Sequence, residues 1–437
     1  MHISHLSLTN FRNYARLELD WPAGIVLLQG DNAQGKTNLL EAIYCLSRTR
    51  SPRTSTEREL VNWLALEEDL PFARLVAQVT KGAETTQIEL AWVQSSTMPA
   101  GMEAPSPSET QAVAFRKHIR VNGTTTRAAN AVGLLNAVLF MPEDIELVAG
   151  APHVRRHYLD DTISQVDPRY YRELQHYERV LTQRNHLLKS LRDRGNDSAQ
   201  LFFWDQRMVE HGSYITVQRE QVIQQLDQAV QRIHSQLTGD SEHLRLEYCP
   251  SIRPTSRLVD SYQMPLLAGP ATAPQDMSTS QASVRLQHVA ASFASQLGQV
   301  HDTELEQGVS LVGPHRDDFR FLVNNVDMHT YGSRGQQRTI ALSLKLAEVE
   351  WITQEKKDKP VLLLDDVFSE LDRSRRSFLT QTIDQAQQVI ITTHDLLPFD
   401  REFLARTTLW RVHAGRLEEL TLSSLPGKRE SAPEGVS

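Results

Sequence analysis

The sequence predicts an α/β fold in which an inserted, mostly helical segment divides one α/β unit into two parts. Strand patterns and a phosphate-binding loop lie within residues 1–160. Helical periodicity follows over residues 161–300, and buried-strand patterns return over residues 301–423. We therefore expect an N-terminal and a C-terminal part of one unit with a helical arm domain between them. The Pro-, Gly- and Ser-containing residues 424–437 are expected to form a disordered tail.

The composition indicates an ordinary globular protein of two or three domains. The chain has 437 residues, of which 40% are hydrophobic and 23% charged, and its net charge is −8. No apolar run approaches the roughly 20 residues of a membrane span, and the N-terminus lacks a secretion signal. Cys45 and Cys249 cannot form a disulfide framework, so we expect a cytoplasmic protein. The negative charge means that nucleic-acid binding would depend on a local basic patch.

Short alternating or continuous apolar segments predict six strands in the N-terminal part. Alternation is the pattern of a half-buried strand, and a continuous apolar run is that of a fully buried one. The segments are residues 2–8, 15–19, 24–29, 73–80, 86–93 and 115–121. The stretch 95–112, rich in Ser and Pro, is expected to be a disordered excursion between strands.

Apolar residues at helical spacing predict two long helices in the middle of the chain. The first set is Leu174, Tyr177, Leu181, Leu188 and Leu191, with Arg184 in one slot, and the second is Val222, Leu226, Ala229 and Ile233. A polar turn over residues 192–197 would join them as an antiparallel pair. Each set spans only about three heptads, so the two helices could be ordinary bundle helices or a short coiled coil. Residues 264–284 are expected to be a mobile linker.

Residues 30–37 match the phosphate-loop pattern in full and follow a buried strand. Gly30 and Gly35 would allow a tight turn, Lys36 would reach the β- and γ-phosphates, and Thr37 would offer its hydroxyl to Mg²⁺. The alternative is a chance Gly-rich turn, but the helical pattern over 38–47 supplies the expected context. The candidate contacts to a nucleoside triphosphate are Gly30, Asp31, Asn32, Ala33, Gln34, Gly35, Lys36 and Thr37.

Two further strand ends carry polar side chains. The apolar run that starts at Val361 ends in Asp365 and Asp366. Asp365 suits a ligand of Mg²⁺, and Asp366 could polarise the attacking water. The next buried run, from Val389, ends in Thr393, His394 and Asp395, where a histidine can reach a γ-phosphate. For the acidic strand end the alternative is a polar turn without a function, and for His394 it is a plain surface histidine.

A third motif opens a helix about thirty residues before the acidic strand. Ser333 and Gly335 provide a hydroxyl and close backbone approach at this helix N-terminus, which is a second candidate anion site. The alternative is an ordinary N-cap. Its position, more than its composition, favours the functional interpretation.

The order of these motifs resembles ABC-type ATPases, and the wide gap between phosphate loop and signature resembles their SMC-like branch. The sequence is most similar to the RecF family of bacterial DNA-repair ATPases, over residues 1 to about 415. The segments that carry the likeness are 10–14, 30–44, 50–54, 140–144, 150–156, 159–160 and 313–318, together with the C-terminal motifs, which include Ser369–Asp372. The inserts at 95–112 and 264–284 are not part of it.

The resemblance implies a head that binds ATP and Mg²⁺ and forms an ATP-dependent homodimer. Ser333, with Gly335 and Gln336, would contact the γ-phosphate held by Lys36 of a second copy, and Arg12 is a further candidate nucleotide contact. Asp366 stands where many ABC ATPases carry Glu, which fits slow hydrolysis. The usual glutamine-loop position falls at Glu143 or Asp144, where no Gln exists.

The resemblance also implies DNA binding, at single strands, gaps or single-strand/duplex junctions. The candidate contacts are Arg48, Arg50 and Arg53 after the phosphate-loop helix and the pair Arg155 and Arg156, because phosphate contacts need such charges. A solvated basic face or ion pairing within the chain is the alternative for each cluster. Implied partners are RecO- and RecR-type mediators that help load the RecA recombinase in gap repair, at stalled forks and in the SOS response.

Two other classes of protein remain as alternatives. A transporter ATPase subunit would have a short, uninterrupted gap between phosphate loop and signature, which this chain lacks. A structural SMC-like tether would need longer arms, because about 35 residues of helix span only roughly 50 Å.

Overall fold

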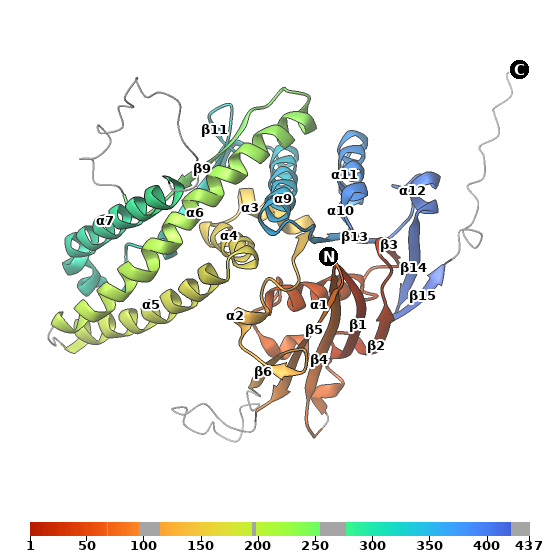
Figure 1. Ribbon diagram of the computed structural model, residues 1–437, viewed down its shortest axis with the longest axis horizontal. Helices are drawn as coiled ribbons and strands as arrows, with labels where there is room; N and C mark the ends of the chain where they lie inside the picture. Colours follow the sequence, from red (N-terminus) through yellow and green to blue (C-terminus); the bar gives the residue numbers. More distant parts are fainter. Residues whose placement is uncertain (68, 96–113, 195–197, 254–276, 421–437) are drawn as a thin grey trace, which may run out of the picture. The chain divides into compact units, whose positions relative to one another are not determined.

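The computed structural model describes residues 1–67, 69–95, 114–194, 198–253 and 277–420. The chain forms two compact units (Figure 1). The first combines Met1–Pro142 with Asp358–Ser437 and is called the head unit; the second is Glu143–Lys357 and is called the arm unit. An α/β unit interrupted by a mostly helical insertion is thus confirmed.

The head unit contains a mixed sheet with the strand order β15-β14-β3-β13-β12-β8. Its strands are β3 (Gly24–Gln29), β8 (Ala137–Phe140), β12 (Val361–Asp365), β13 (Gln388–Thr393), β14 (Thr407–His413) and β15 (Arg416–Leu420). All neighbours pair in parallel except β14 and β15. Because parallel strands end at one edge, the residues after β3, β12 and β13 meet there.

A second, antiparallel sheet in the head unit has the order β2-β1-β4-β5-β6-β7. Its strands are β1 (His2–Phe11), β2 (Tyr14–Asp20), β4 (Phe72–Lys81), β5 (Glu84–Gln94), β6 (Phe115–Val121) and β7 (Thr124–Thr125). With β3, these elements confirm all six strands expected from the N-terminal sequence. The helices of this unit are α1 (Lys36–Arg48), α2 (Ala128–Ala131), α10 (Val367–Glu370), α11 (Arg373–Gln385) and α12 (Arg401–Ala405).

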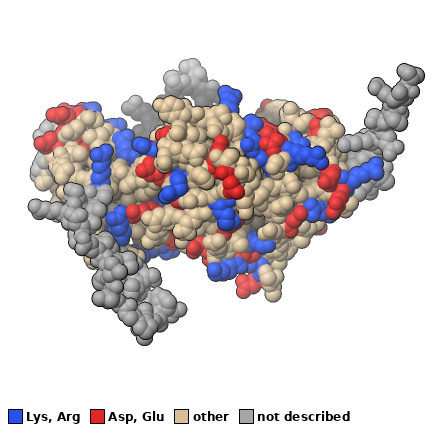
Figure 2. Space-filling model, turned by 90° about the horizontal axis from the view of Figure 1, so that it is seen from above, with Lys and Arg blue, Asp and Glu red and all other residues tan. Residues whose placement is uncertain are grey.

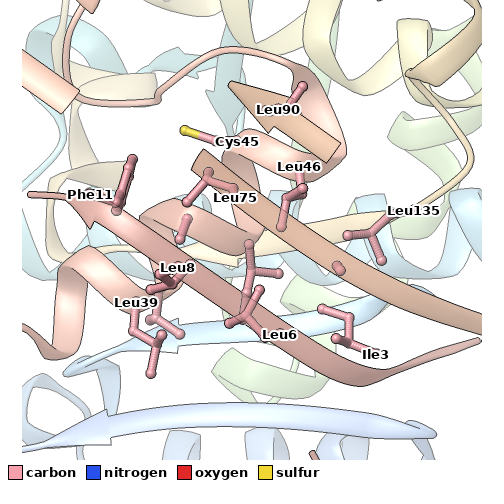
Figure 3. Close-up of a cluster of buried hydrophobic side chains, with 14 of the residues drawn as sticks. Ile3, Leu6, Leu8, Phe11, Leu39, Cys45, Leu46, Leu75, Leu90 and Leu135 are labelled. Carbon is pink, nitrogen blue, oxygen red and sulfur yellow. The ribbon is translucent and has the colours of Figure 1, made fainter. Parts of the chain in front are cut away.

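Helix α1 is anchored by a hydrophobic core that it shares with the antiparallel sheet. Leu39 and Leu46 of α1 are fully buried and belong to the same cluster as Leu6 and Leu8 of β1 and Leu75 of β4 (Figure 3). Burying a leucine side chain contributes on the order of 2 kcal/mol. This packing fixes the helix that begins at the end of the phosphate loop.

The arm unit is built from helices and one small sheet. Its helices are α3 (Glu146–Ala149), α4 (Pro152–Val166), α5 (Pro168–Arg194), α6 (Leu201–Thr238), α7 (Met277–Gln307), α8 (Met328–Tyr331) and α9 (Arg334–Lys356). The sheet has the order β11-β10-β9, with β9 (Leu244–Cys249), β10 (Asp318–Val323) and β11 (Val326–Asp327). The two expected long helices are α5 and α6. Because α6 contacts α7 and α9 as well as α5, the pair is part of a bundle.

Arg184 interrupts the apolar stripe of α5 for a structural reason. Its side chain is 1% exposed and forms ion pairs with Glu304 at 2.6 Å and Asp205 at 2.7 Å. The guanidinium also donates to Ser310 Oγ at 2.7 Å. A charge in a helical core position is tolerated when it is paired in this way.

A buried cluster of charged and tyrosine side chains in the arm unit includes Asp317 of the segment 313–318. Arg219 donates to Asp160 Oδ1 at 2.7 Å and to the carbonyl of Pro314 at 2.6 Å, and it lies 3.3 Å from Asp317. Tyr170 donates to Asp160 and Tyr248 to Asp317, each at 2.5 Å. We call these five side chains the Arg219 network: Asp160, Tyr170, Arg219, Tyr248 and Asp317. They tie α4, α5, α6 and β9 together.

The compact units divide the chain after residues 142 and 357, whereas the sequence suggested boundaries at 160 and 300. The three-domain division therefore stays a prediction. Helix α7 begins at Met277, inside the stretch 264–284 for which a linker was expected. The rest of that stretch, residues 96–112 and the tail 424–437 lie outside the described residues. Within the described part of the chain, no helix has both the length and the apolar character needed to cross a membrane.

Candidate nucleotide-binding site

The phosphate loop joins β3 to α1 in the head unit. Ala33 and Gly35 adopt left-handed backbone conformations, with φ of 64° and 110°. Gly30 has no such conformation, and it is a glycine for another reason, because a Cβ there would lie 2.4 Å from the carbonyl oxygen of Val412 in β14. Gly35 therefore supplies the expected tight turn, whereas Gly30 allows β14 to approach.

Lys36 is buried at the start of α1, with 8% of its surface exposed. Its ammonium donates to the carbonyl oxygens of Gly30 at 2.6 Å and Asp31 at 2.8 Å. Burial lowers the pKa of Lys36, and the carboxylates of Asp366, Asp365 and Asp31 oppose that shift. A buried cation surrounded by carbonyl oxygens suits a strongly anionic ligand such as a phosphate chain.

Thr37 and Asp365 meet at the carboxyl edge of the sheet. Thr37 Oγ1 donates to Asp365 Oδ1 at 3.0 Å, although the two residues are 328 positions apart in the sequence. Thr392 at the end of β13 donates to the same oxygen at 2.6 Å. The buried carboxylate is thus oriented toward the first turn of α1. A hydroxyl and a carboxylate oxygen are ligands that Mg²⁺ accepts, so this donor set fits the ion.

Asp366 and His394 lie beside each other at the ends of adjacent strands. His394 Nδ1 is 3.5 Å from Asp366 Oδ1, and its Nε2 is 2.8 Å from Asp395 Oδ2. Asp366 has φ of 50° and its backbone N–H donates to Thr392 Oγ1 at 3.0 Å. Within the described residues, the buried Oδ1 of Asp366 accepts no hydrogen bond. This oxygen is shielded from solvent, and His394 Nδ1 lies 3.5 Å from it.

Arg12 lies next to the phosphate-loop helix but is already engaged. Its guanidinium donates to both oxygens of the buried Glu41, at 3.0 and 2.7 Å, and to the carbonyl of Glu59 at 2.8 Å. Its side chain is 18% exposed. Glu41 was not singled out from the sequence, since an acidic residue in the middle of an amphipathic helix suggests a solvent-exposed position. A nucleotide contact by Arg12 stays a prediction.

The signature residues begin helix α9 in the arm unit. Ser333 caps the helix: its hydroxyl accepts from the N–H of Gln336 at 3.3 Å, and its own N–H donates to Gln336 Oε1 at 3.0 Å. Gln336 also donates to Glu242 Oε1 at 2.9 Å. A Cβ on the exposed Gly335 would meet nothing within 4 Å. Glu143 and Asp144 lie in the short 3-10 helix Pro142–Ile145, and their suggested role stays a prediction.

Three of the five arginines expected to bind DNA make hydrogen bonds within the chain, two of them from buried positions. Arg48 is 4% exposed and donates to the carbonyl of Ala137 at 3.2 Å. Arg155 is 4% exposed and makes two hydrogen bonds to Asp318, at 2.7 and 2.9 Å. Arg156 is half-buried and donates to the carbonyl of Asp317 at 2.9 Å. These hydrogen bonds engage the three guanidinium groups within the chain, and DNA contacts by them stay predictions.

Arg50 and Arg53 remain on the surface of the head unit. Both side chains are exposed, and Arg53 donates to Asn38 Oδ1 at 3.2 Å and lies 3.7 Å from Glu41. Basic and acidic side chains are interspersed on the face shown in Figure 2.

Comparison with known proteins agrees with this architecture. The fold and the phosphate loop define the class of SMC-type heads, and the family model described as "RecF/RecN/SMC N terminal domain" matches residues 2–401. The DNA replication and repair protein RecF of Herpetosiphon aurantiacus is 41% identical over 425 residues, covering 95% of this chain and 99% of that protein. The Bacillus subtilis protein of the same name is 37% identical over 418 residues, with 95% and 100% covered.

On this identity and coverage, the chain belongs to the RecF family. A solved structure of the recombination mediator protein RecF with ATP, in the RecFOR pathway, is similar with a TM-score of 0.76 and 28% identity, covering 96% of this chain and 97% of that one. A second structure of that mediator, RecF-ATPrS, has a TM-score of 0.76 and 29% identity, with 96% and 98% covered.

Proposed function

We propose that this protein binds ATP, hydrolyses it slowly and uses it to control a DNA-binding dimer in recombinational repair. The observation that carries the ATP-binding part is the hydrogen bond of 3.0 Å between Thr37 and Asp365. It joins the phosphate-loop helix to the acidic strand at the sheet edge, where Mg²⁺ and the phosphates would be held. The related RecF structures with ATP support the same ligand.

Each side chain of the head unit has a role in this proposal. Lys36 holds the β- and γ-phosphates, and Thr37 and Asp365 hold Mg²⁺, which when bound neutralises negative charge on the phosphates. Asp366 accepts a hydrogen bond from the attacking water and orients it. His394, 3.5 Å from Asp366, contacts the γ-phosphate side of the site. The short reach of an aspartate in place of glutamate fits slow hydrolysis.

The signature segment is proposed to complete the site of a second copy. Its helix N-terminus presents N–H groups, the Ser333 hydroxyl and an exposed glycine to solvent. A backbone can approach Gly335 closely because no side chain stands there. ATP bound at Lys36 of one chain would therefore be contacted by Ser333 of the other. Binding would join two heads, and hydrolysis would release them.

The proposed biological setting follows the relatives. They carry the description of DNA replication and repair proteins and of a mediator in the RecFOR pathway. We accordingly propose single-stranded or gapped DNA as the ligand and RecO- and RecR-type proteins as partners in loading a recombinase. Arg50 and Arg53 are the candidate DNA contacts that the fold leaves exposed.

The test measures dimerisation and DNA affinity with and without ATP. Sedimentation of the full chain should show a dimer only with ATP and Mg²⁺, and gapped DNA should bind more tightly in that state. Lys36→Met should abolish both effects, while Lys359→Met, at an exposed position far from the loop in sequence, should retain them. A Lys36→Met protein that still dimerises with ATP would contradict the mechanism.

A further inference from the structure

Two β-hairpin turns hold the phosphate loop from outside the nucleotide motifs. The first is the turn between β1 and β2. Asn13 Nδ2 donates to the carbonyl oxygen of Gln34 at 3.1 Å, and the hydroxyl of Tyr14 donates to the carbonyl oxygen of Gly35 at 3.0 Å. Tyr14 is fully buried, so this bond is shielded from water. The turn thus fixes two consecutive peptide groups of the loop.

The second turn lies between β14 and β15. The N–H of Gly415 donates to the same carbonyl of Gln34 at 3.2 Å, and the N–H of Ala414 donates to the side-chain oxygen of Gln34 at 2.8 Å. Ala414 and Gly415 adopt φ of 47° and 74°. Both N–H groups point at one residue because the turn takes this left-handed conformation. Gln34 is therefore held through its backbone and its side chain.

The two turns and the loop leave no room between them. A Cβ on Gly415 would lie 2.9 Å from the carbonyl oxygen of Asn13, and a Cβ on Gly35 would lie 2.4 Å from the Asn13 side chain. Any side chain at Gly415 must therefore push the two turns apart, and both turns are hydrogen-bonded to Gln34. Movement there reaches the two residues of the loop with left-handed backbone, Ala33 and Gly35.

The geometry points to the Ala414–Gly415 turn as a positioning element of the phosphate loop: by holding Gln34, it keeps the loop in the conformation that receives a triphosphate. Ala414 and Gln34 are 380 positions apart in the chain, and no phosphate-loop pattern includes this turn. A binding loop that is already ordered loses less conformational freedom when its ligand arrives. The inference rests on the proposed ATP binding and adds a determinant of its affinity.

The chain offers a matched control for the test. Asn122 and Gly123, in the turn between β6 and β7, have φ of 50° and 77°, close to the values at Ala414 and Gly415. A Cβ at Gly123 would meet nothing within 4 Å. Gly123→Ala and Gly415→Ala therefore introduce similar backbone strain in similar turns. Only the second change reaches the phosphate loop.

The experiment measures the dissociation constant of ATP for the full chain and both variants. Gly415→Ala should weaken ATP binding at least tenfold, and Gly123→Ala should stay within twofold of the parent. In steady-state hydrolysis, Gly415→Ala should raise KM and leave kcat nearly unchanged, because the turn does not touch Asp366. Equal ATP affinities of the two variants would overturn the inference.

A second variant covers the case in which Gly415→Ala does not fold. Asn13→Ala removes the other hydrogen bond to the Gln34 carbonyl, together with the one that Asn38 Nδ2 donates to Asn13 Oδ1 at 2.8 Å, without adding atoms. It should weaken ATP binding about fivefold. Parent-like ATP affinity of folded Asn13→Ala would count against positioning by the turns. If the parent protein binds no ATP, the proposed function itself is wrong. If the parent binds ATP and the variants bind it equally well, only the positioning role is wrong, so the two failures are distinguishable.

Discussion

The nucleotide site of the head unit and the Arg219 network of the arm unit contain the same kinds of charged side chain in opposite environments. In the network, the side chains of Arg219 and Asp317 are 3% and 1% exposed. At the nucleotide site, the side chains of Asp366 and His394 are 40% and 48% exposed. The contrast separates these two pairs by exposure, whereas Lys36 and Asp365, which are buried and belong to the nucleotide site, show that burial alone does not decide between stability and ligand binding.

The partners of the charges make the same distinction. Asp317 accepts hydrogen bonds from Tyr248 and from the N–H of Ser251, in addition to its ion pair with Arg219. Asp366 Oδ1, by contrast, accepts none from the described residues. Removing a charge from the network should therefore destabilise the fold, whereas removing one from the open site should chiefly affect the ligand.

The largest effect is expected when the network loses its cation. Arg219→Met leaves the carboxylates of Asp160 and Asp317 buried without their partner, which should lower the free energy of unfolding by about 3–5 kcal/mol. Urea unfolding of the full chain measures this change. The exposed Arg192, whose side chain is 44% exposed beside Asp193, provides the control, and Arg192→Met should cost less than about 0.5 kcal/mol. Similar losses of unfolding free energy in both variants would contradict the stabilising role of the Arg219 network.

Acidification should lower the free energy of unfolding by a smaller amount. Burial lowers the pKa of His315 to about 4, and the cations Arg316, Arg156 and Arg184 add to that shift. Its Nε2 lies 3.1 Å from the carbonyl of Ser310 and its Nδ1 lies 2.6 Å from the hydroxyl of Tyr177. The folded state thus binds fewer protons than the unfolded state between about pH 4 and 6.5.

Because the unfolded chain takes up the proton first, stability is fully present above pH 6.5 and is lost as the pH falls toward 4. The loss assigned to this histidine is roughly 3 kcal/mol. Urea unfolding between pH 4 and 7.5 measures it, with His315→Asn as the comparison. The parent should lose more stability than His315→Asn across this window. Parallel pH profiles would show that His315 is not the buried neutral group described above.

The smallest effect on stability is expected at the open site. Asp366→Asn should change the free energy of unfolding by less than about 0.5 kcal/mol, since the side chain is partly exposed and has few internal partners. The same change should slow ATP hydrolysis by a factor on the order of 100, because an amide is a poor acceptor for the proton of the attacking water. Phosphate release and urea unfolding measure the two quantities. A stability loss as large as that of Arg219→Met would erase the difference between the regions.

Local patterns allowed much of the fold and of the head site to be predicted from the sequence. Strand alternation and the phosphate-loop spacing are properties of neighbouring residues, and β1 to β6 and the start of α1 formed where these patterns stood. Whether a charged side chain is paired and buried or exposed depends on residues that are distant in the sequence. Arg155 and Arg53 look alike in the sequence, but only Arg155 meets a carboxylate 163 positions later.

The same reason explains the residues that sequence patterns missed. The sequence pattern suggests that Glu41 is a surface residue of a helix, yet Arg12 and Ser51 both donate hydrogen bonds to its carboxylate. The Ala414–Gly415 turn reads as an ordinary hairpin, although its N–H groups end at Gln34. Asn13 and Tyr14 stood inside a segment that marked the family resemblance. That resemblance could have suggested a role beside the loop, but it could not have supplied the contact.

The sheet order has a consequence for how the chain can be synthesised and folded. Strand β3 ends at Gln29 and lies between β13 and β14, which begin at Gln388 and Thr407. At about 5–20 residues per second, a ribosome needs roughly 20 to 70 s to make the intervening residues. During that time the strand that leads into the phosphate loop has neither of its neighbours. The arm unit can fold before the head unit is complete. The nascent chain therefore exposes β3 as an unpaired apolar strand that chaperones could bind.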